Sequence, residues 1–320
     1  MSIYKHILGL SPWIEVIIKS LYWRSAFFHN LLSSKKKLRN TKRINQPKVT
    51  LGFSSIKKAL NILNAGHTGI MIVHSSMKML SSTNLTPDQI CKELIDFLGP
   101  EGTLAMPAIP LYREEPVGLE RLKDTICEKR IIYDVRRTKT WTGDLPKALK
   151  SLPGAIRSRH PLNTLVAIGP QATKMMSHNI EGSLPKPCGP QSSWKYCADR
   201  NATIVCLGVN TAPCLTMLHV AEDCWPENWP IKNWYRQRKF HIIDGDYRTD
   251  LDVLERHPRC SINFAQYTLQ KDLLKLGIVK VTEIDGIRVE TCSSAKLINY
   301  LNSKRPSSYP YWIPFWDKIK

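Results

Sequence analysis

The sequence GIMIVHSS at residues 69–76 predicts a buried strand that ends in small polar residues. A helix is predicted after it, because Thr86 can act as a cap, Pro87 suits a first helical turn and Gly99 can end the helix. The sequence GTLAMP at residues 102–107 then predicts a second strand. This alternation predicts an α/β fold, in which helices flank a layered mixed β-sheet.

The same alternation extends in both directions from this unit. On the N-terminal side, Ser54 is expected to cap a helix that ends before Gly66. On the C-terminal side the pattern predicts a helix at 145–152, strands at 165–169 and 202–208, a helix near 263–276, and strands near 278–281 and 286–290.

Three regions have no such regular pattern. Residues 111–140 are charged and lack clear periodicity, so we expect a long surface loop with a short helix. Beyond Trp225 the sequence is aromatic and basic, and no element is predicted there before residue 263. The tail at residues 309–316 is rich in aromatic residues and is expected to pack on the body of the protein.

The composition is that of a globular protein. With 42% hydrophobic and 23% charged residues, the 320-residue chain can bury a core in one large domain or two small ones. Its nine cysteines are scattered without a C-x-x-C pair, so neither a disulfide framework nor a metal site is expected. Glu15 and Lys19 interrupt the apolar N-terminus, which does not fit a signal peptide. We therefore expect a cytoplasmic protein.

The net charge of +19 is unevenly distributed. Residues 1–50 contain ten basic residues and one acidic residue, so they carry +9, and the other 270 residues carry +10. This divides the chain into a basic N-terminal extension at 1–50 and a domain at 51–320. A positive field favours anionic ligands, although solubility explains the charge of the body equally well.

The N-terminal extension has an amphipathic helical pattern. Apolar residues recur at intervals of three and four from Ile7 to Leu21, and again from Phe28 to Leu32. Six basic residues follow between positions 35 and 43. Such a segment can lie on an anionic membrane surface, or its helix can dock on the body or on a second copy of the chain, through residues 1–46.

Three segments carry residues suited to chemistry. His160 precedes Pro161, which holds it in a turn at a sheet edge, although this evidence alone favours a surface histidine. His219 and Glu222 are three residues apart, so one helix face brings them together, as it also does in ordinary surface pairs. The third segment places small hydroxyl residues after a strand, where free N–H groups can hold a phosphate or an amide; it comprises Ser75 and Ser76, with Trp141 and Thr142.

Six sequence blocks, taken in order, resemble the aminoglycoside 3-N-acetyltransferase family. The resemblance runs from about Ser54 to Asp223, and residues 1–50 lie outside it. No single block would be sufficient, but the six follow the order and spacing of the family. They are HSSMK at 74–78, LGPEGTLAMP at 98–107, TWTGDLP at 140–146, PGAIRSRHP at 153–161, AIGPQA at 167–172 and LHVAE at 218–222.

The resemblance implies a metal-free enzyme that transfers an acetyl group from acetyl-CoA to an amino group of an aminoglycoside or another amino sugar. Amine acylation needs a base, which a histidine–carboxylate pair can supply. The motif matches imply that His160, His219 and Glu222 are the catalytic residues, and that Ser75, Ser76, Trp141 and Thr142 line the channel for acetyl-CoA.

The sequence also departs from the family pattern. It carries the basic extension, and residues 184–190 enlarge a block that is shorter in the family. The basic body would repel a polycationic antibiotic, whereas it would attract an amino sugar linked to a nucleotide. The alternative function is that of an inactive family member that binds a membrane or a protein partner. A nucleic-acid partner is not expected, because no recognition motif is present.

Overall fold

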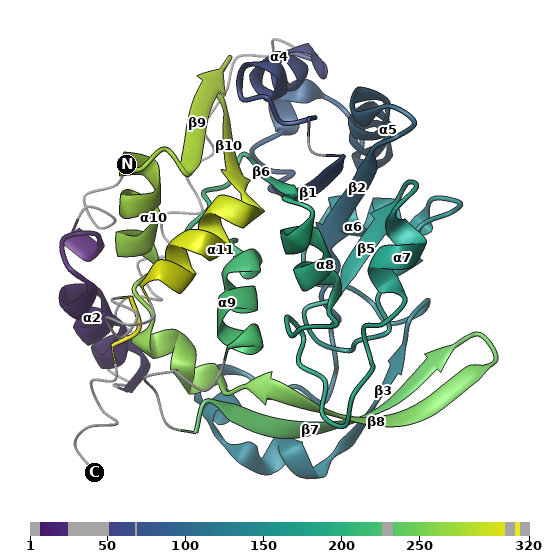
Figure 1. The fold of residues 1–320 in the computed structure, drawn as a ribbon, viewed down its shortest axis with the longest axis vertical. Helices are drawn as coiled ribbons and strands as arrows, with labels where there is room; N and C mark the ends of the chain where they lie inside the picture. Colours follow the sequence, from purple (N-terminus) through teal and green to yellow (C-terminus); the bar gives the residue numbers. More distant parts are fainter. Residues whose placement is uncertain (1–6, 25–50, 68, 226–232, 305–310, 314–320) are drawn as a thin grey trace.

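The computed structural model describes residues 7–24, 51–67, 69–225, 233–304 and 311–313. The expected α/β fold is confirmed, with a mixed sheet flanked by helices (Figure 1). The helices are α2 (Pro12–Arg24), α4 (Ser54–Ile62), α5 (Pro87–Leu98), α6 (Asp144–Ser151), α7 (Ala172–Met176), α8 (Ser193–Asp199), α9 (His219–Cys224), α10 (Gln266–Lys275) and α11 (Ser294–Ser303). Short 3-10 helices are η1 (Ser81–Thr83), η2 (Gly118–Leu122), η3 (Asp124–Glu128), η4 (Thr216–Leu218) and η6 (Pro258–Asn263).

The main sheet has seven strands in the order β4-β5-β2-β1-β6-β10-β9. Its centre is parallel, because β1 pairs in parallel with both β2 and β6, while the outer strands pair antiparallel. These strands are β1 (Ile70–Ser75), β2 (Thr103–Pro107), β4 (Ile156–Arg157), β5 (Leu165–Ile168), β6 (Thr203–Leu207), β9 (Val279–Ile284) and β10 (Ile287–Ser293).

Successive side chains of the central strands enter two different cores. In β1, Ile70 and Ile72 pack among α8, α9, α10 and α11, whereas Met71 and Val73 pack among α4, α5 and α6. This follows from the period of two in a strand, which places neighbouring side chains on opposite faces. Burial on both faces explains why β1 begins as an unbroken apolar run rather than as an alternating pattern.

A second sheet lies at the edge of the first and was missed by the sequence predictions. It has the order β3-β7-β8, with β3 (Arg130–Asp134), β7 (Tyr235–Asp244) and β8 (Tyr247–Arg256), and the long β7–β8 hairpin crosses the bottom of Figure 1. The expectation of a surface loop at 111–140 was therefore wrong in part, because β3 buries Ile131 and Tyr133 against the hairpin. The exposed Ile132 beside Ile131 had broken the alternation that is expected of a half-buried strand.

Two further sequence expectations can be compared with local structure. Thr86 caps α5, with its side chain accepting from the Gln89 N–H, and the helix ends at Gly99 as predicted. The cap assigned to Ser54 was wrong: α4 begins at Ser54 itself, and its hydroxyl donates to the Leu51 carbonyl at 3.0 Å. In the aromatic tail, Trp312 is buried and stacks on Phe264, as expected for a tail packed on the body.

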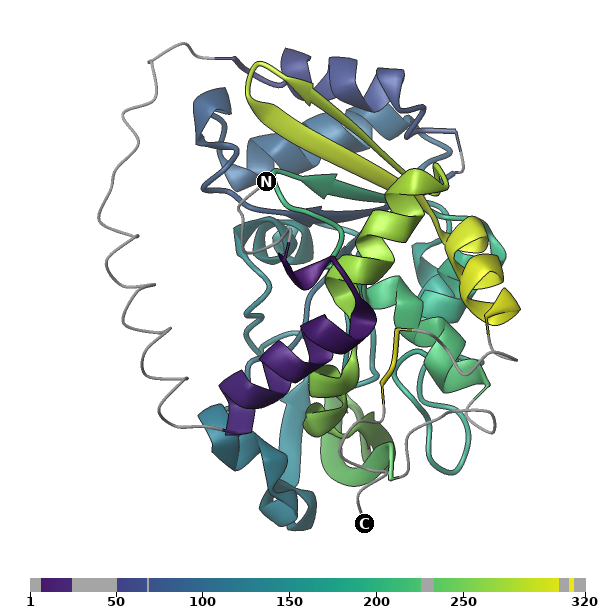
Figure 2. The same ribbon diagram turned by 90° about the vertical axis from the view of Figure 1, so that its left-hand side faces the viewer.

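Helix α2 docks on the body beside α10 (Figure 2). The buried Glu15 carboxylate accepts hydrogen bonds from the backbone N–H groups of Tyr267 and Thr268, at 3.1 Å each, at the first turn of α10. Lys19 pairs with Glu15 and donates to the Phe264 carbonyl at 2.6 Å. The two charged residues that interrupt the apolar pattern thus form the contact with the body. The predicted continuation at 28–32 and the basic run at 35–43 lie outside the described residues.

Among the helices that the structure describes, none is long and apolar enough to span a bilayer.

Candidate active site

A cavity of about 830 Å³ lies where three chain segments meet. They are the segment after β2 between residues 109 and 122, the segment after β6 between residues 212 and 222, and the end of β8 with the turn that follows, between residues 255 and 262. Because β1, β2 and β6 are parallel, the connections that leave them start at one edge of the sheet. The carboxyl edge of parallel strands is where α/β proteins usually bind ligands.

His219 and Glu222 form a pair on the wall of this cavity. His219 begins α9, and Nδ1 of its ring lies 2.7 Å from Oε2 of Glu222, one helical turn later. The histidine side chain is 20% exposed, whereas that of Glu222 is 1% exposed. The predicted helix face therefore brings the two residues together, with the imidazole toward the cavity and the carboxylate behind it.

Arg256, the last residue of β8, joins this pair. Its Nη1 donates to Oε2 of Glu222 at 2.8 Å and also contacts Nδ1 of His219. With its proton on Nδ1 the ring donates to Glu222, and Arg256 then donates to the carboxylate rather than to the ring. This tautomer leaves Nε2 of the imidazole as a proton acceptor. In the part of the chain that the structure describes, Nε2 has no hydrogen-bond partner, so this nitrogen is available to a ligand in the cavity.

The charges of the cluster favour a neutral imidazole. Burial and the Arg256 guanidinium lower the pKa of His219, against the raising effect of Glu222. The pKa of Glu222 is lowered as well, because the effects of His219 and Arg256 together outweigh burial. An ionised carboxylate beside a neutral imidazole is the arrangement that a general base requires.

Asp223 has a different role in the same helix. It is fully buried, and it accepts from the Cys188 N–H at 3.0 Å and from the Tyr235 hydroxyl at 2.9 Å. Burial raises the pKa of this carboxyl to about 6. Lys186 donates to the Asp223 carbonyl at 3.2 Å, so this residue ties the enlarged segment at 184–190 to α9 and β7.

His160 does not line the cavity. It is 2% exposed, and its ring bonds only backbone groups in the described structure. Nε2 can donate to the Pro185 carbonyl at 3.3 Å while Nδ1 accepts from the Leu162 N–H at 3.2 Å. Burial lowers its pKa to about 4. The neighbouring residues 161–163 do line the cavity, so His160 lies next to a wall segment and does not itself face the interior.

The four residues expected in an acetyl-CoA channel are spread over one region. Trp141 is 61% exposed and lines the cavity. The Thr142 hydroxyl is held by the Pro107 carbonyl at 2.5 Å, at the carboxyl end of β2. Ser75 ends β1, and the Ser76 N–H donates to the Leu207 carbonyl at 3.1 Å. Ser75, Ser76 and Thr142 thus lie along the same sheet edge as the cavity without forming its wall.

A second pair of the same spacing shows why spacing alone is a weak signal. His178 and Glu181 are also three apart, with Nδ1 and Oε1 2.6 Å from each other, but both side chains are more than half exposed. They lie outside the cavity. The difference from His219 and Glu222 is burial and the added arginine, which no local sequence pattern reveals.

Arg256 and Asp223 were missed by the sequence predictions. Arg256 lies in a hairpin that was not predicted, 34 residues after Glu222. The one available signal was the adjacent pair of carboxylates in the helix, Glu222 and Asp223, since two buried acids side by side require a cation nearby.

Comparison with known proteins identifies relatives over part of the chain. Aminoglycoside N(3)-acetyltransferase IX of Micromonospora chalcea is 30% identical over 176 residues, which cover 53% of this chain and 60% of the relative. Aminoglycoside N(3)-acetyltransferase VIII of Streptomyces fradiae is 28% identical over 172 residues, covering 51% and 57%. The chain thus spans about three fifths of the length of these curated relatives.

Solved structures share the fold. The binary complex of AAC-IIIb with CoASH has a TM-score of 0.62 at 20% identity, covering 78% of this chain and 94% of the other. A mutant of aminoglycoside acetyltransferase AAC(3)-IVa in complex with apramycin has a TM-score of 0.60 at 21% identity, covering 82% and 95%. A family model described as aminoglycoside 3-N-acetyltransferase matches residues 72–304, so the resemblance of the six blocks is confirmed and the chain belongs to the aminoglycoside 3-N-acetyltransferase family.

Proposed function

We propose that the protein transfers the acetyl group of acetyl-CoA to an amino group of an aminoglycoside or another amino sugar, with residues 51–320 as the catalytic domain. The observation that carries this proposal is the His219–Glu222–Arg256 cluster on the wall of an 830 Å³ cavity. The volume of the cavity lies in the range of ~300–1,000 Å³ that is typical of small-molecule sites.

In this mechanism His219 is the general base. Acetyl-CoA supplies an activated acetyl thioester. Nε2 of His219 takes the proton from the attacking amine while the new C–N bond forms and the C–S bond breaks; the proton then neutralises the departing thiolate. Glu222 holds the Nδ1–H tautomer and stabilises the imidazolium that forms, as a buried carboxylate does for other catalytic histidines.

Acetyl-CoA is proposed to approach along the sheet edge. Trp141 offers an apolar surface at the cavity, and Ser75 and Ser76 offer hydroxyl groups at the end of β1. The Ser75 and Ser76 hydroxyls make no hydrogen bond to any residue that the structure describes, which leaves them available to a ligand amide. His160 is proposed to hold residues 161–163 in place rather than to touch substrate.

The test is an assay of thiol release from acetyl-CoA with a panel of amine acceptors, with the acetylated product identified by mass. Turnover that depends on the acceptor and is lost in His219→Ala supports the proposal. Absence of turnover with every amine, in protein shown to be folded, would instead favour the alternative of an inactive family member that binds a membrane or a protein partner.

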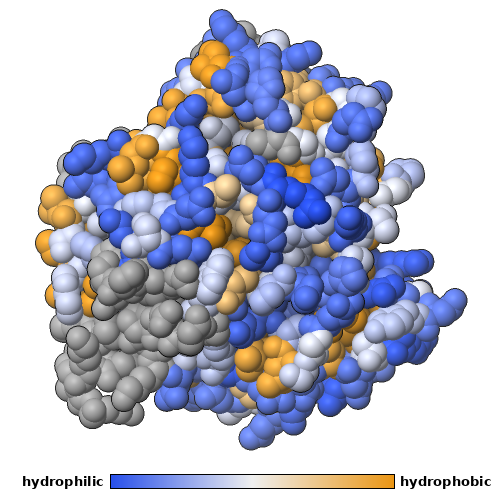
Figure 3. Space-filling view, viewed as in Figure 1, coloured by the Kyte–Doolittle hydropathy of each residue, from blue (hydrophilic) through white to orange (hydrophobic). Residues whose placement is uncertain are grey.

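We also propose that the outer face of α2 rests on an anionic membrane surface. One face of the helix holds the body through Glu15 and Lys19. The apolar side chains on the remaining surface of α2 are 37% to 49% exposed; they are Trp13, Ile14, Ile17 and Leu21. Ile7 and Leu10, just before the helix, are exposed as well. Figure 3 shows apolar residues at the left-hand edge, where α2 lies, on a face that is otherwise mostly hydrophilic.

A membrane is favoured as the occupant of this face because of the charge that follows it in the sequence. Six basic residues lie between positions 35 and 43, and each is worth about 1 kcal/mol near an anionic bilayer. A second copy of the chain would bring the same +9 segment against itself, which costs free energy.

The membrane proposal is tested by sedimentation with phosphatidylglycerol and phosphatidylcholine vesicles. The wild type is expected to bind the anionic vesicles but not the neutral ones, and high salt should abolish this binding. The double variant Leu10→Asp/Ile17→Asp and a protein that lacks residues 1–46 should not bind either kind of vesicle. Ile62→Asp, a change at an exposed apolar residue of α4, is the matched control and should bind normally. If the wild type does not bind vesicles but forms a dimer, and the double variant is a monomer, the membrane proposal is refuted and α2 is a self-association surface.

A further inference from the structure

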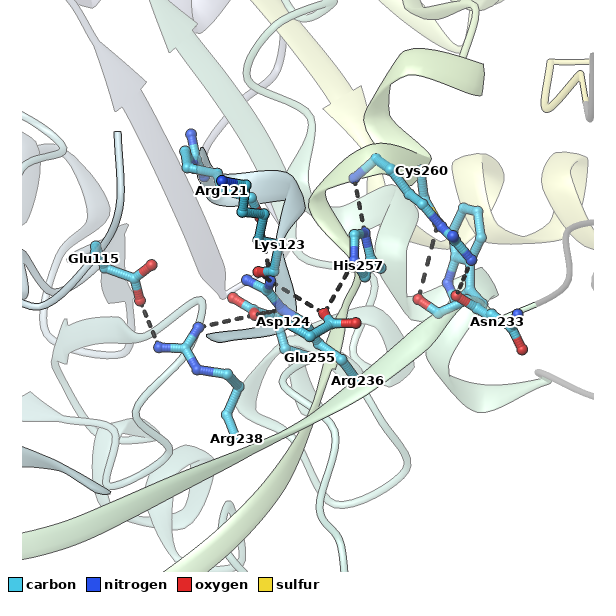
Figure 4. A network of polar contacts seen from close by, with 12 residues as sticks. Glu115, Arg121, Lys123, Asp124, Asn233, Arg236, Arg238, Glu255, His257 and Cys260 are labelled. Carbon is cyan, nitrogen blue, oxygen red and sulfur yellow. Dashed lines mark hydrogen bonds and ion pairs between the residues drawn. The ribbon is translucent and has the colours of Figure 1, made fainter. Parts of the chain in front are cut away.

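The carboxylates on the cavity wall are already neutralised by arginines. Glu115 accepts from Nη2 of Arg238 at 2.6 Å, and Glu255 accepts from Nη1 of the same arginine at 2.9 Å (Figure 4). Glu255 also accepts from Nε of Arg236 at 2.7 Å. Together with Glu222 and its partner Arg256, this accounts for every carboxylate among the described residues of the wall.

These arginines are buried and fixed. The side chain of Arg238 is fully buried and that of Arg236 is 5% exposed, and both belong to β7. Two Nη1 hydrogen bonds from Arg236, to the carbonyls of Arg121 and Lys123, further hold it against η2. A ligand cannot displace such partners without leaving a buried charge unpaired, which typically costs ~3–5 kcal/mol.

Positive charge is in excess on the same wall. Arg113 and Arg121 line the cavity from the segment after β2, and both are exposed. Within the described residues neither guanidinium has an ion pair or a hydrogen bond to a side chain, since the contact of Arg121 with Arg236 uses its carbonyl. The cavity therefore presents two available guanidinium groups and no available carboxylate among the residues described.

From this pairing we propose that the acceptor amino sugar carries an anionic group, a phosphate or a carboxylate, that Arg113 and Arg121 bind. The proposal rests on the proposed acetyl transfer and specifies its substrate class. Guanidinium groups bind phosphate and carboxylate through two parallel hydrogen bonds. A polycationic aminoglycoside would instead meet two like charges, with no free carboxylate on the described wall to offset them.

Acetyl-CoA is itself anionic, so the two arginines could serve the donor rather than the acceptor. The two assignments differ in which Michaelis constant the arginines control. The experiment therefore measures KM for each substrate separately in the wild type, in Arg113→Gln and in Arg121→Gln. Arg248→Gln, a change at an exposed arginine of β8 outside the cavity, is the control for a general loss of positive charge.

The acceptors are glucosamine 6-phosphate, glucosamine and apramycin, which differ in charge. We expect kcat/KM for the phosphorylated sugar to exceed that for glucosamine by about tenfold, and each arginine variant to remove most of this preference. The KM for acetyl-CoA should stay within about twofold, and Arg248→Gln should behave as the wild type.

Two results overturn the inference while leaving the proposed function intact. One is a higher kcat/KM for apramycin than for the phosphorylated sugar; the other is a rise in the KM for acetyl-CoA alone in the arginine variants. If no amine is turned over, calorimetry of the acceptors without acetyl-CoA distinguishes failure of this inference from failure of the proposed function. Binding of the phosphorylated sugar without turnover of any amine supports the charge preference and refutes acetyl transfer, and absence of both refutes both.

Discussion

Arg256 donates a hydrogen bond of 2.8 Å to Glu222, and so links the end of β8 to the first turn of α9. The arginine is fixed next to His219 as well, which gives the histidine a neighbour of each charge. Opposite effects on the histidine pKa follow: Glu222 raises it, whereas burial and Arg256 lower it, and the lowering effects are larger. The hairpin therefore places next to His219 a charge that disfavours its protonation.

The pH dependence of turnover should show this effect. His219 must be unprotonated to act as a base, and its pKa is lowered from 6.5, so the acidic limb of kcat/KM should lie below pH 6.5. Arg256→Gln removes a positive charge and leaves Glu222 unopposed, so the acidic limb should move to higher pH. Profiles of kcat/KM between about pH 5 and 8 test this, and an unchanged limb in Arg256→Gln would remove the arginine from any control of His219.

Loss of the base itself should be much more costly. His219→Ala and Glu222→Ala should each lower turnover by ~10²–10⁴-fold, the usual contribution of a general acid–base group. The exposed pair His178 and Glu181, at the same spacing, supplies matched controls, and His178→Ala and Glu181→Ala should retain near wild-type turnover. A loss below about threefold in both variants of the buried pair would exclude it from the mechanism.

The local chemistry of the site was predictable from the sequence, whereas its electrostatics were not. The helix face that pairs His219 with Glu222 depends only on a three-residue spacing, and the sheet edge with Ser75 depends on a continuous apolar run. Arg256 and Arg238 act across the fold, through a hairpin that gave no strand signal. In β7 the buried positions include Arg236 and Arg238, so its buried face is not apolar throughout. The turn at His160 was predicted correctly, but its burial was not. The ring is enclosed by a segment 25 residues away, where Nε2 contacts the Pro185 carbonyl.

His160 is expected to couple stability to pH. Its pKa is about 4 in the folded protein, whereas in the unfolded chain it is near the ordinary ~6.5. The unfolded state therefore binds a proton first, so the stabilisation is complete above about pH 6.5 and is lost as the pH falls toward about 4, by about 3 kcal/mol. The stability of the wild type relative to His160→Gln should shrink by about 2 kcal/mol between about pH 7 and 4.5 in urea unfolding.

The same variant separates positioning from catalysis. If His160 only holds residues 161–163, His160→Gln should keep much of the turnover, because an amide can still donate to the Pro185 carbonyl, whereas His160→Ala should lose turnover without a change in acetyl-CoA affinity. Equal and severe losses of turnover in both variants would show that catalysis needs the imidazole itself. Unchanged turnover in His160→Ala would leave it without a role in the site.

Glu15 is expected to anchor the N-terminal helix to the body. Its carboxylate accepts from two backbone N–H groups in the first turn of α10, and Glu15→Ala leaves both without that partner and Lys19 without its ion pair. Loss of a capping side chain typically costs ~0.5–2 kcal/mol, and the buried lysine adds to this, because burial already lowers its pKa. Glu15→Gln is the matched control, since its amide oxygen can still accept one hydrogen bond, and it should lose less stability.

Urea unfolding of the wild type and the two variants gives their free energies of unfolding, and vesicle sedimentation of the folded variants shows whether α2 stays in place. If Glu15→Ala were as stable as the wild type and unchanged in limited proteolysis near residue 24, the contact between α2 and α10 would contribute nothing to the fold.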